Sequence, residues 1–308
     1  MFIKIGYDIA LRFSVPTAVI YLLHVHASRR GHLVLPENFR IEPEFPIEEF
    51  LDQFGNLCGR FKAPGGDVRF LNEAVIHDNG ELDVYAPEAA QHEVQELPVE
   101  ALTFLLPSRY CEVDSELLDF AWKAFGNTPE GWSRVQSICD FVHGHLRFDY
   151  QQARVDRTAL DAFRERVGVC RDFMHLAITL CRCMNVPARY VTGYLGEIGV
   201  PAAPYPMDFS AWFEAYLGGR WHAFDARHNC RRIGRVLIAR GRDAADVPIT
   251  MSFGKSCLLN FSITTEELDP RSTGALADFG EFVSEKKQSP PWMPQAVDLG
   301  SHRPVLSD

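Results

Sequence analysis

One cysteine, Cys170, stands where the sequence could support covalent chemistry. It follows Gly168 and Val169, and the residues at i+3, i+4, i+7, i+8 and i+11 after it are all apolar or cysteine. This spacing predicts one broad apolar face on a buried helix. A thiol at a helix N-terminus lies near the positive end of the helix dipole and near free N–H groups, which favour the reactive thiolate. The pattern therefore predicts a nucleophile, with one more buried structural cysteine as the alternative.

A predicted hairpin supplies candidate partners for the thiol. Gly218-Gly219 forms a two-residue turn between strands at 209–217 and 220–225. In this register Trp212 faces Asp225, and Ser210 is the diagonal neighbour of Asp225, about 7–8 Å away between backbones. Glu214 lies along the same face, where we expect a salt bridge. A side chain as short as that of Ser210 is expected barely to reach Asp225.

The elements that would position these residues are helical before Cys170 and extended after it. Capping signals predict helices at 115–125 and 128–145, a short strand at 147–150, and a small helix that ends near Arg166. The cysteine helix ends at 185–187, and a strand follows at 189–195. Glycine-rich turns separate short runs of β-forming residues over positions 1–100, at 3–13, 18–26, 40–44, 59–62, 67–76 and 82–85. Several short strands at close spacing predict a β-sandwich.

Composition narrows the class of protein. The chain has 308 residues, of which 46% are hydrophobic, and its formal net charge is −10. Such a chain has enough apolar surface for two domains, and its acidity argues against nucleic acid as a partner. The charge also disfavours acidic substrates, although a local basic pocket could override it. The eight cysteines are scattered, the N-terminus resembles a strand more than a signal peptide, and the apolar run at 15–23 is too short to span a bilayer. We expect a cytoplasmic protein without membrane association.

Rival motifs fail on their residue types or spacing. The segment Gly254-Lys255-Ser256 is half of a phosphate-binding loop, but Ile249 stands where that motif needs glycine. No Gly-x-Ser-x-Gly elbow and no glycine-rich dinucleotide motif are present. The histidine pairs at 24 and 26 and at 143 and 145 have no third ligand in reach by sequence, so we expect structural roles for them. We predict no metal and no organic cofactor.

Four motifs in order resemble one known family. They are Gly-Val-Cys-Arg-Asp-Phe at 168–173, Pro-Ala-Arg-Tyr-Val-Thr-Gly-Tyr at 187–194, Ser-Ala-Trp-Phe-Glu-Ala-Tyr at 210–216 and Trp-His-Ala-Phe-Asp-Ala at 221–226. Together they resemble the bacterial transglutaminase-like superfamily, and the β-rich N-terminus with Phe-Gly-Asn at 54–56 is similar to the sandwich that precedes the core in many members. The resemblance covers residues 1 to about 270.

The resemblance implies an α+β fold, with an N-terminal antiparallel β-sandwich at 1–100 and a papain-like or transglutaminase-like core at 101–270. The few apolar runs after about residue 271 indicate an extended tail at 271–308. Members of the family are commonly described as cysteine proteases. The implied chemistry is a Cys-His-Asp triad acting on a peptide or protein amide through an acyl-enzyme, with hydrolysis, amine transfer or amide formation as the outcome. By position, Cys170 is the nucleophile and Asp225 orients the histidine.

This chain departs from the family pattern at the histidine. Ser210 stands in the position where the histidine is expected, and serine near neutral pH cannot take the cysteine proton. His222 lies on the strand face opposite Asp225, and His175 points about 140° around the helix from the thiol. His228 follows Asp225 by three residues, so a loop there could return it to the cleft as a substitute base.

Other residues could line the cleft. Trp212 is a candidate wall of the site or a core residue, and Tyr150 is a candidate lining or oxyanion residue. Asp172 is a candidate contact or, as we favour, an acid of the helix N-terminus without a catalytic role. The oxyanion donor would otherwise include the backbone N–H of Cys170. Two further interpretations stay open: a non-catalytic binding or scaffold module with the same fold, and an introduced inactivating change at Ser210.

Overall fold

Two antiparallel sheets, built from strands within residues 2–77 and 250–268, form one part of the computed structural model, which describes residues 1–201 and 207–269. One sheet has the order β15-β1-β7-β3, with β4 also paired to β7, and the other has the order β14-β2-β6-β5. Tyr21 and Phe61 of the second sheet contact Phe70 of the first, with ring centroids 5.7 and 5.9 Å away. The aromatic residues between the sheets form a sandwich core, as the sequence predicts.

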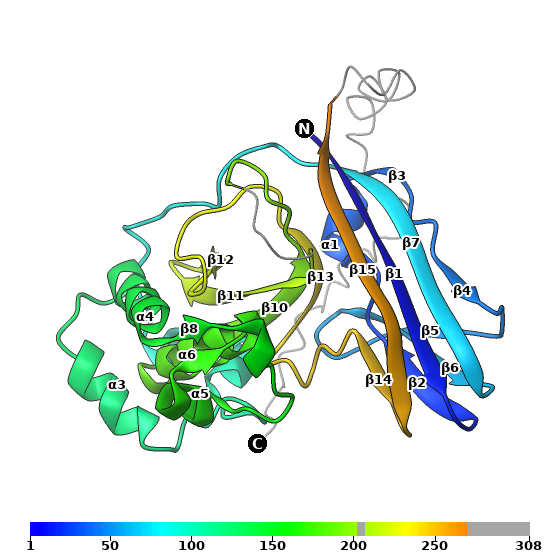
Figure 1. Ribbon diagram of the computed structural model, residues 1–308. Coiled ribbons are helices and arrows are strands. Elements are labelled where there is room, and N and C mark those ends of the chain that lie inside the picture. The colour runs from blue at the N-terminus through cyan, green and yellow to red at the C-terminus, as the bar shows by residue number, and fades with distance from the viewer. Residues whose placement is uncertain (202–206, 270–308) are drawn as a thin grey trace, which may run out of the picture. The chain divides into compact units, whose positions relative to one another are not determined.

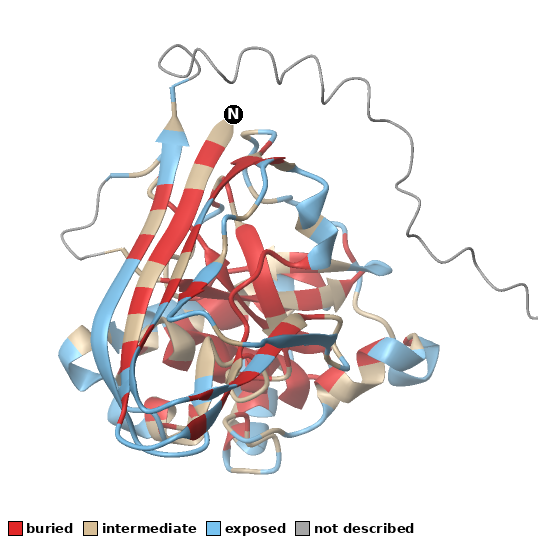
Figure 2. Ribbon diagram, turned by 90° about the vertical axis from the view of Figure 1, so that its right-hand side faces the viewer, coloured by how far each residue is buried: buried red, intermediate tan, exposed pale blue. Residues whose placement is uncertain are grey.

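Alternating burial along the long strands explains why these segments form a sandwich. Residues 3, 5, 7, 9, 11 and 13 of β1 are buried, and Figure 2 shows the alternation along this strand. Successive side chains of a strand point to opposite faces, so this period of two places one face in the core. The strands are β1 (Phe2–Phe13), β2 (Thr17–Tyr21), β3 (Leu33–Leu35), β4 (Arg40–Glu42), β5 (Glu48–Leu51), β6 (Leu57–Ala63), β7 (Gly66–His77), β14 (Thr250–Ser252) and β15 (Ser256–Leu268).

The second part of the fold packs helices against a four-stranded sheet of order β12-β11-β10-β13. Figure 1 shows α6 among the other helices and below this sheet. The helices are α1 (Ala27–Arg30), α2 (Val99–Leu102), α3 (Leu117–Phe125), α4 (Trp132–His145), α5 (Ala159–Glu165) and α6 (Cys170–Cys183). The strands are β8 (Arg147–Phe148), β9 (Val167–Gly168), β10 (Ala188–Tyr194), β11 (Ser210–Leu217), β12 (Arg220–Phe224) and β13 (Val236–Gly241). The predicted α+β fold class is confirmed.

Helix α6 is the centre of this part of the fold. Every residue from Asp172 to Cys183 is buried, so the predicted apolar stripe underestimates how completely the helix is enclosed. The hairpin of β11 and β12 has the predicted register, with Leu217 opposite Arg220 and Phe213 opposite Phe224. Continuing that register places Trp212 opposite Asp225, as predicted. The structure therefore places Cys170 at the first residue of α6 and Asp225 directly after β12.

Two segments differ from their predicted structure. The strand predicted at 18–26 ends at Tyr21, and His26 instead accepts a hydrogen bond from the backbone N–H of Ser28 at the start of α1. The strand predicted at 82–85 is reduced to a single bridge between Leu82 and Ile233. The β-like sequence at 256–264 pairs along β1 of the sandwich. The tail predicted from residue 271, with its proline-rich stretch at 289–294, lies outside the described residues.

Candidate active site

The start of α6 is fixed by a buried carboxylate. Asp172 accepts a hydrogen bond from the backbone N–H of Val169 at 2.9 Å and forms an ion pair with Arg157 at 3.0 Å. A side chain at Gly168 would place its Cβ 2.6 Å from the Cβ of Asp172, so only glycine allows this approach. The favoured prediction for Asp172, an acid of the helix N-terminus, matches these contacts. They hold Cys170 at a defined position.

The thiol of Cys170 is protonated at neutral pH. Cys170 is half-buried, and burial raises the pKa of its thiol to about 11, although the positive charge of Arg227 and a backbone N–H oppose the shift. Asp208 acts in the same direction as burial. The sequence predicts that the helix N-terminus favours thiolate, but here desolvation outweighs the opposing effects of Arg227 and the backbone N–H. A reaction at Cys170 near neutral pH therefore needs a group that accepts the proton.

His228 is held by Asp225 through a short loop that follows β12. The His228 Nδ1 and Asp225 Oδ2 atoms lie 2.8 Å apart, and the other carboxylate oxygen accepts the backbone N–H groups of Arg227 and His228. Arg235 also contacts Asp225 Oδ2, at 3.2 Å. Burial opposes ionisation, but His228 and Arg235 outweigh it and hold the pKa of Asp225 well below its ordinary value. The ionised carboxylate accepts a hydrogen bond from the Nδ1–H group, which leaves Nε2 unprotonated as the base.

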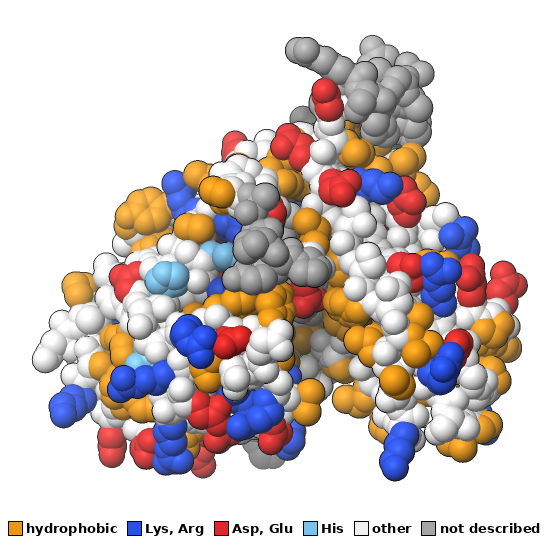
Figure 3. All heavy atoms as spheres, in the orientation of Figure 1, with side chains coloured by type: hydrophobic (Ala, Val, Ile, Leu, Met, Phe, Trp, Pro, Cys, Tyr) orange, Lys and Arg blue, Asp and Glu red, His pale blue; other side chains and the backbone are white. Residues whose placement is uncertain are grey.

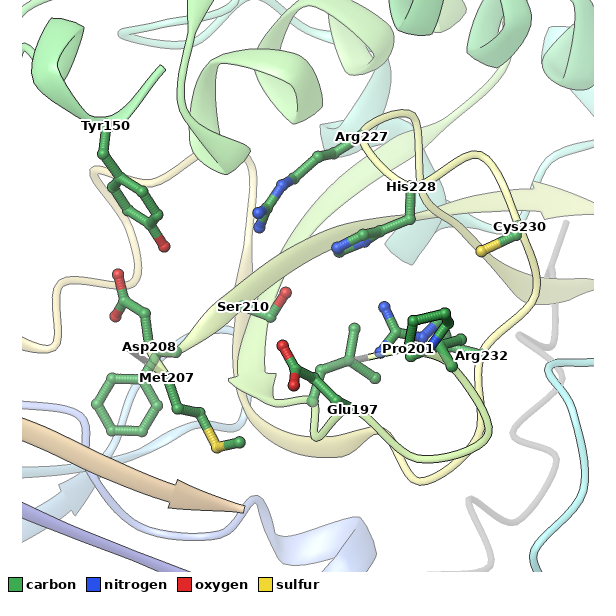
Figure 4. Close-up of a pocket in the computed structure, with 13 residues that line it drawn as sticks. Tyr150, Glu197, Pro201, Met207, Asp208, Ser210, Arg227, His228, Cys230 and Arg232 are labelled. Atoms are coloured by element: carbon green, nitrogen blue, oxygen red, sulfur yellow. The ribbon is translucent and has the colours of Figure 1, made fainter. Parts of the chain in front are cut away.

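A pocket of about 340 Å³ brings several of these residues together. Its walls include Ser210, His228 and Tyr150, and also Arg227 and Asp208, two of the residues whose charges act on Cys170. Figure 4 shows the imidazole of His228 projecting into the pocket toward Ser210 and Arg227. Of the predicted site residues, Ser210, His228 and Tyr150 line this pocket, and Asp225 is joined to it through the contact with His228. Cys170 is not among the residues that line it.

Other predicted residues do not line this pocket. Trp212 is buried with Val191 and Leu237 in a small cluster of its own, and Arg235 stacks on its ring at 5.0 Å. Trp212 is therefore a core residue, and Asp172 is a capping residue; neither contributes to the pocket wall.

The remaining histidines and Glu214 have structural contacts. His175 stacks on Tyr110 and accepts the backbone N–H of Ala244 through Nε2. The ring of His222 packs edge-on against Trp132. Glu214 forms the expected salt bridge, with Arg189 at 2.5 Å. Neither histidine replaces His228 as the partner of Asp225.

Four residues near the site were missed by sequence reasoning. Arg227, Asp208 and Arg232 line the pocket, and Arg235 joins Asp225 to Asp83. The arginines fall in an irregular loop after β12, where no periodicity indicates direction. The density of arginine between positions 227 and 235 was the one available signal, and it does not say which side chains converge.

Comparisons with known proteins agree with this architecture. Residues 121–226 match the model of the transglutaminase-like superfamily. The chain is similar to a solved structure from Cytophaga hutchinsonii named "Putative Cysteine Protease", with 34% identity and a TM-score of 0.75, over 87% of this chain and 91% of the other.

Mycobacterial relatives cover less of the chain. An uncharacterized protein of Mycobacterium leprae is 25% identical over 208 residues, which is 64% of this chain and 72% of the relative. An uncharacterized protein of Mycobacterium tuberculosis is 35% identical over 92 residues, which is 27% of this chain and 29% of the relative.

The fold, the cysteine at the start of the central helix and these matches define a protein of the transglutaminase-like class. The chain belongs to the transglutaminase-like superfamily. Over residues 1–201 and 207–269, none of the helices is long and apolar enough to cross a membrane. Among the same residues, no group of three or more His, Cys, Asp or Glu side chains is arranged to hold a metal ion.

Replacing Asp172 with alanine is expected to lower the free energy of unfolding by about 3 kcal/mol, because Arg157 loses a buried partner and α6 loses its cap. Urea unfolding followed by circular dichroism measures this. Asp156→Ala, which removes an exposed ion pair with Arg154, serves as the control and is expected to cost less than about 1 kcal/mol. Equal losses in the two variants would contradict the capping role.

Asp225 should make the stability of the protein depend on pH. Its folded pKa lies below the ordinary value of about 3.9, so the ionised carboxylate contributes stability above about pH 4 and loses it as the pH falls through the folded pKa. The difference in unfolding free energy between wild type and Asp225→Asn should therefore be largest near pH 6 and narrow below about pH 4. Urea titrations between these values measure it, and a difference that widens on acidification would contradict the assignment.

Proposed function

We propose that the protein is a cysteine enzyme that acts on amide bonds, with Cys170 as the nucleophile. His228 is the base, in place of the histidine expected at the position of Ser210. The observation that carries this proposal is the pair of His228 Nδ1 and Asp225 Oδ2 at 2.8 Å, beside a pocket that contains Ser210. Asp225 orients the imidazole, as the third group of such a triad does.

The proposed reaction proceeds through a thioester. His228 Nε2 accepts the thiol proton as the sulfur of Cys170 attacks the carbonyl carbon, which gives a tetrahedral oxyanion. When this intermediate collapses, the C–N bond breaks and the imidazolium returns its proton to the leaving amine. Water then attacks the thioester in a hydrolase, or an amine attacks it in a transferase, and His228 removes the proton of that acceptor.

Because the thiol of Cys170 is mostly protonated, the reaction requires a base that removes its proton. With a pKa of about 11, Cys170 holds roughly one part in ten thousand as thiolate at pH 7. A preformed thiolate–imidazolium pair is not required, because proton removal can accompany attack. Arg227, whose positive charge lowers the pKa of the thiol, would also stabilise the developing negative charge.

A second candidate function is a binding or scaffold module with the transglutaminase-like fold. Two observations favour it: Ser210 in the expected histidine position and the raised thiol pKa. In that case the pair of Asp225 and His228 would serve only to hold the loop after β12. The two functions differ in whether Cys170 accepts an acyl group.

Acyl transfer from p-nitrophenyl acetate separates them. The protein is mixed with the ester at pH 7.5, quenched in acid and mapped by peptide mass spectrometry. The enzyme proposal predicts an acetyl group on Cys170 that forms faster than on the exposed Cys257, which does not line the pocket, and its absence from Cys170→Ala. Acetylation of Cys170 no faster than of Cys257 would favour the binding module.

A further inference from the structure

We infer that the pocket beside the Asp225–His228 pair binds a carboxylate group through Arg232, and that the amide substrate therefore carries a carboxylate. That the bound molecule is a substrate rests on the proposed function; the binding of the carboxylate does not.

Arg232 is a buried cation whose guanidinium forms no ion pair with a carboxylate of the described residues. It is 5% exposed and lines the pocket. Its Nη2 donates to the carbonyl of Gly196 at 2.8 Å, but its Nε has no acceptor within the described part of the chain. Within those residues, no carboxylate forms an ion pair with its guanidinium. Burying a charged group without such a partner is costly, so its presence at a pocket wall points to a ligand.

Two carboxylates whose charges act on Arg232, those of Asp83 and Asp225, already accept hydrogen bonds from other groups. Asp83 accepts the Nε of Arg235 at 2.9 Å and the backbone N–H of Arg232 at 2.9 Å. Asp225 accepts from His228 and from Arg235. Burial and the charge of Arg235 lower the pKa of Arg232, with Asp225 and Asp83 only partly offsetting them. The backbone contact fixes the position of Arg232, whose side chain is part of the pocket wall.

The pocket carries other charged side chains. Glu197 and Asp208 also line it, and burial raises the pKa of Asp208 toward its neutral form. Arg227 adds a second positive charge, stacked on the ring of Phe148 at 3.8 Å. Figure 4 shows Arg227 and Arg232 on different sides of His228.

The two arginines of this pocket contrast with the mixed, net negative charge of the molecule's surface. The net charge is −10, and Figure 3 shows acidic and basic side chains interspersed over the visible face. Local arginines inside a low-dielectric pocket outweigh a distant, screened surface charge. A carboxylate with two acceptor oxygens suits the planar donors of a guanidinium.

Calorimetric titration with glutarate tests the site, with glutaramide as a neutral probe of the same length. We expect glutarate to bind the wild-type protein in the millimolar range and glutaramide not to bind. Arg232→Gln should weaken glutarate binding about tenfold or more, because a charge-assisted hydrogen bond is lost. Arg231→Gln is the matched control, because Arg231 is the neighbouring residue but stacks on Tyr85 and does not line this pocket. Glutarate binding by this variant should stay within about twofold of that by the wild type.

Protection of Cys170 from iodoacetamide shows whether the anion binds near this thiol. The measurement uses the wild-type protein, so it does not depend on whether Arg232→Gln folds. Glutarate should slow alkylation of Cys170 in the wild type, and glutaramide should not. Failure of glutarate to bind, equal binding of the two probes, unchanged binding in Arg232→Gln, or binding without protection would each overturn the inference. Binding and protection without acetyl transfer to Cys170 would support the carboxylate site while contradicting the proposed enzyme.

Discussion

Replacing His228 with alanine is expected to slow acetylation of Cys170 by about 10²- to 10⁴-fold at pH 7.5, the range that a positioned general base contributes. The physical reason is the thiol pKa of about 11, which leaves too little thiolate for attack unless a base removes the proton. The rate of nitrophenol release, together with the acetyl content of the Cys170 peptide, measures the loss. The fold should survive, because His228 is only half-buried.

Two variants make this result specific. His32→Ala removes an exposed histidine of the sandwich and should leave the rate unchanged. In His228→Ala the carboxylate of Asp225 loses its imidazole, so a histidine introduced by Ser210→His on the adjacent strand gains a free partner. The double variant is expected to recover about tenfold over His228→Ala. A rate in His228→Ala equal to that of wild type would remove His228 from the mechanism.

Asp225→Asn is expected to lower the same rate by up to about 10⁴-fold while His228 remains in place. The carboxylate accepts a hydrogen bond from the Nδ1–H group, which keeps Nε2 unprotonated. An amide in its place can donate to Nδ1, which moves the ring proton to Nε2 and removes the base. The loss should appear in the rate constant for acetylation per folded molecule, measured after correction for the fraction folded.

A matched carboxylate separates this effect from a general loss of stability. Asp246 forms an ion pair with Arg242 at 2.9 Å and does not line the pocket, so Asp246→Asn should acetylate Cys170 at the wild-type rate. If Asp225→Asn also retained the wild-type rate, the pair with His228 would be structural only.

The sequence predicted the rigid elements well because their signals are periodic. The apolar spacing after Cys170 indicates a buried helix, and Gly218-Gly219 fixes the register of the hairpin to the residue. Where a segment has a weaker pattern, tertiary contacts decide. The run at 18–26 is rich in β-forming residues, yet His26 serves as the cap of α1 and ends the extended stretch.

The candidate site was only partly predictable, because its chemistry depends on an irregular loop. The position of Asp225 follows from the hairpin register, but the return of His228 follows from two backbone hydrogen bonds to the Asp225 carboxylate that no periodicity encodes. The environment of the thiol was also beyond the sequence. A helix N-terminus argues for thiolate, whereas the degree of burial, which reverses the sign of the shift, depends on residues far apart in the chain.

The pH dependence of Cys170 alkylation by iodoacetamide tests the central claim most directly. The background is Cys230→Ser with Cys257→Ser, which removes the two exposed thiols, since the other five cysteines are buried. If His228 is the base, Cys170 should react at pH 7 faster than a thiol with a pKa of about 11 allows, and His228→Ala should abolish this excess and leave one step near pH 11. A single step near pH 11 that is identical with and without His228 would contradict the account.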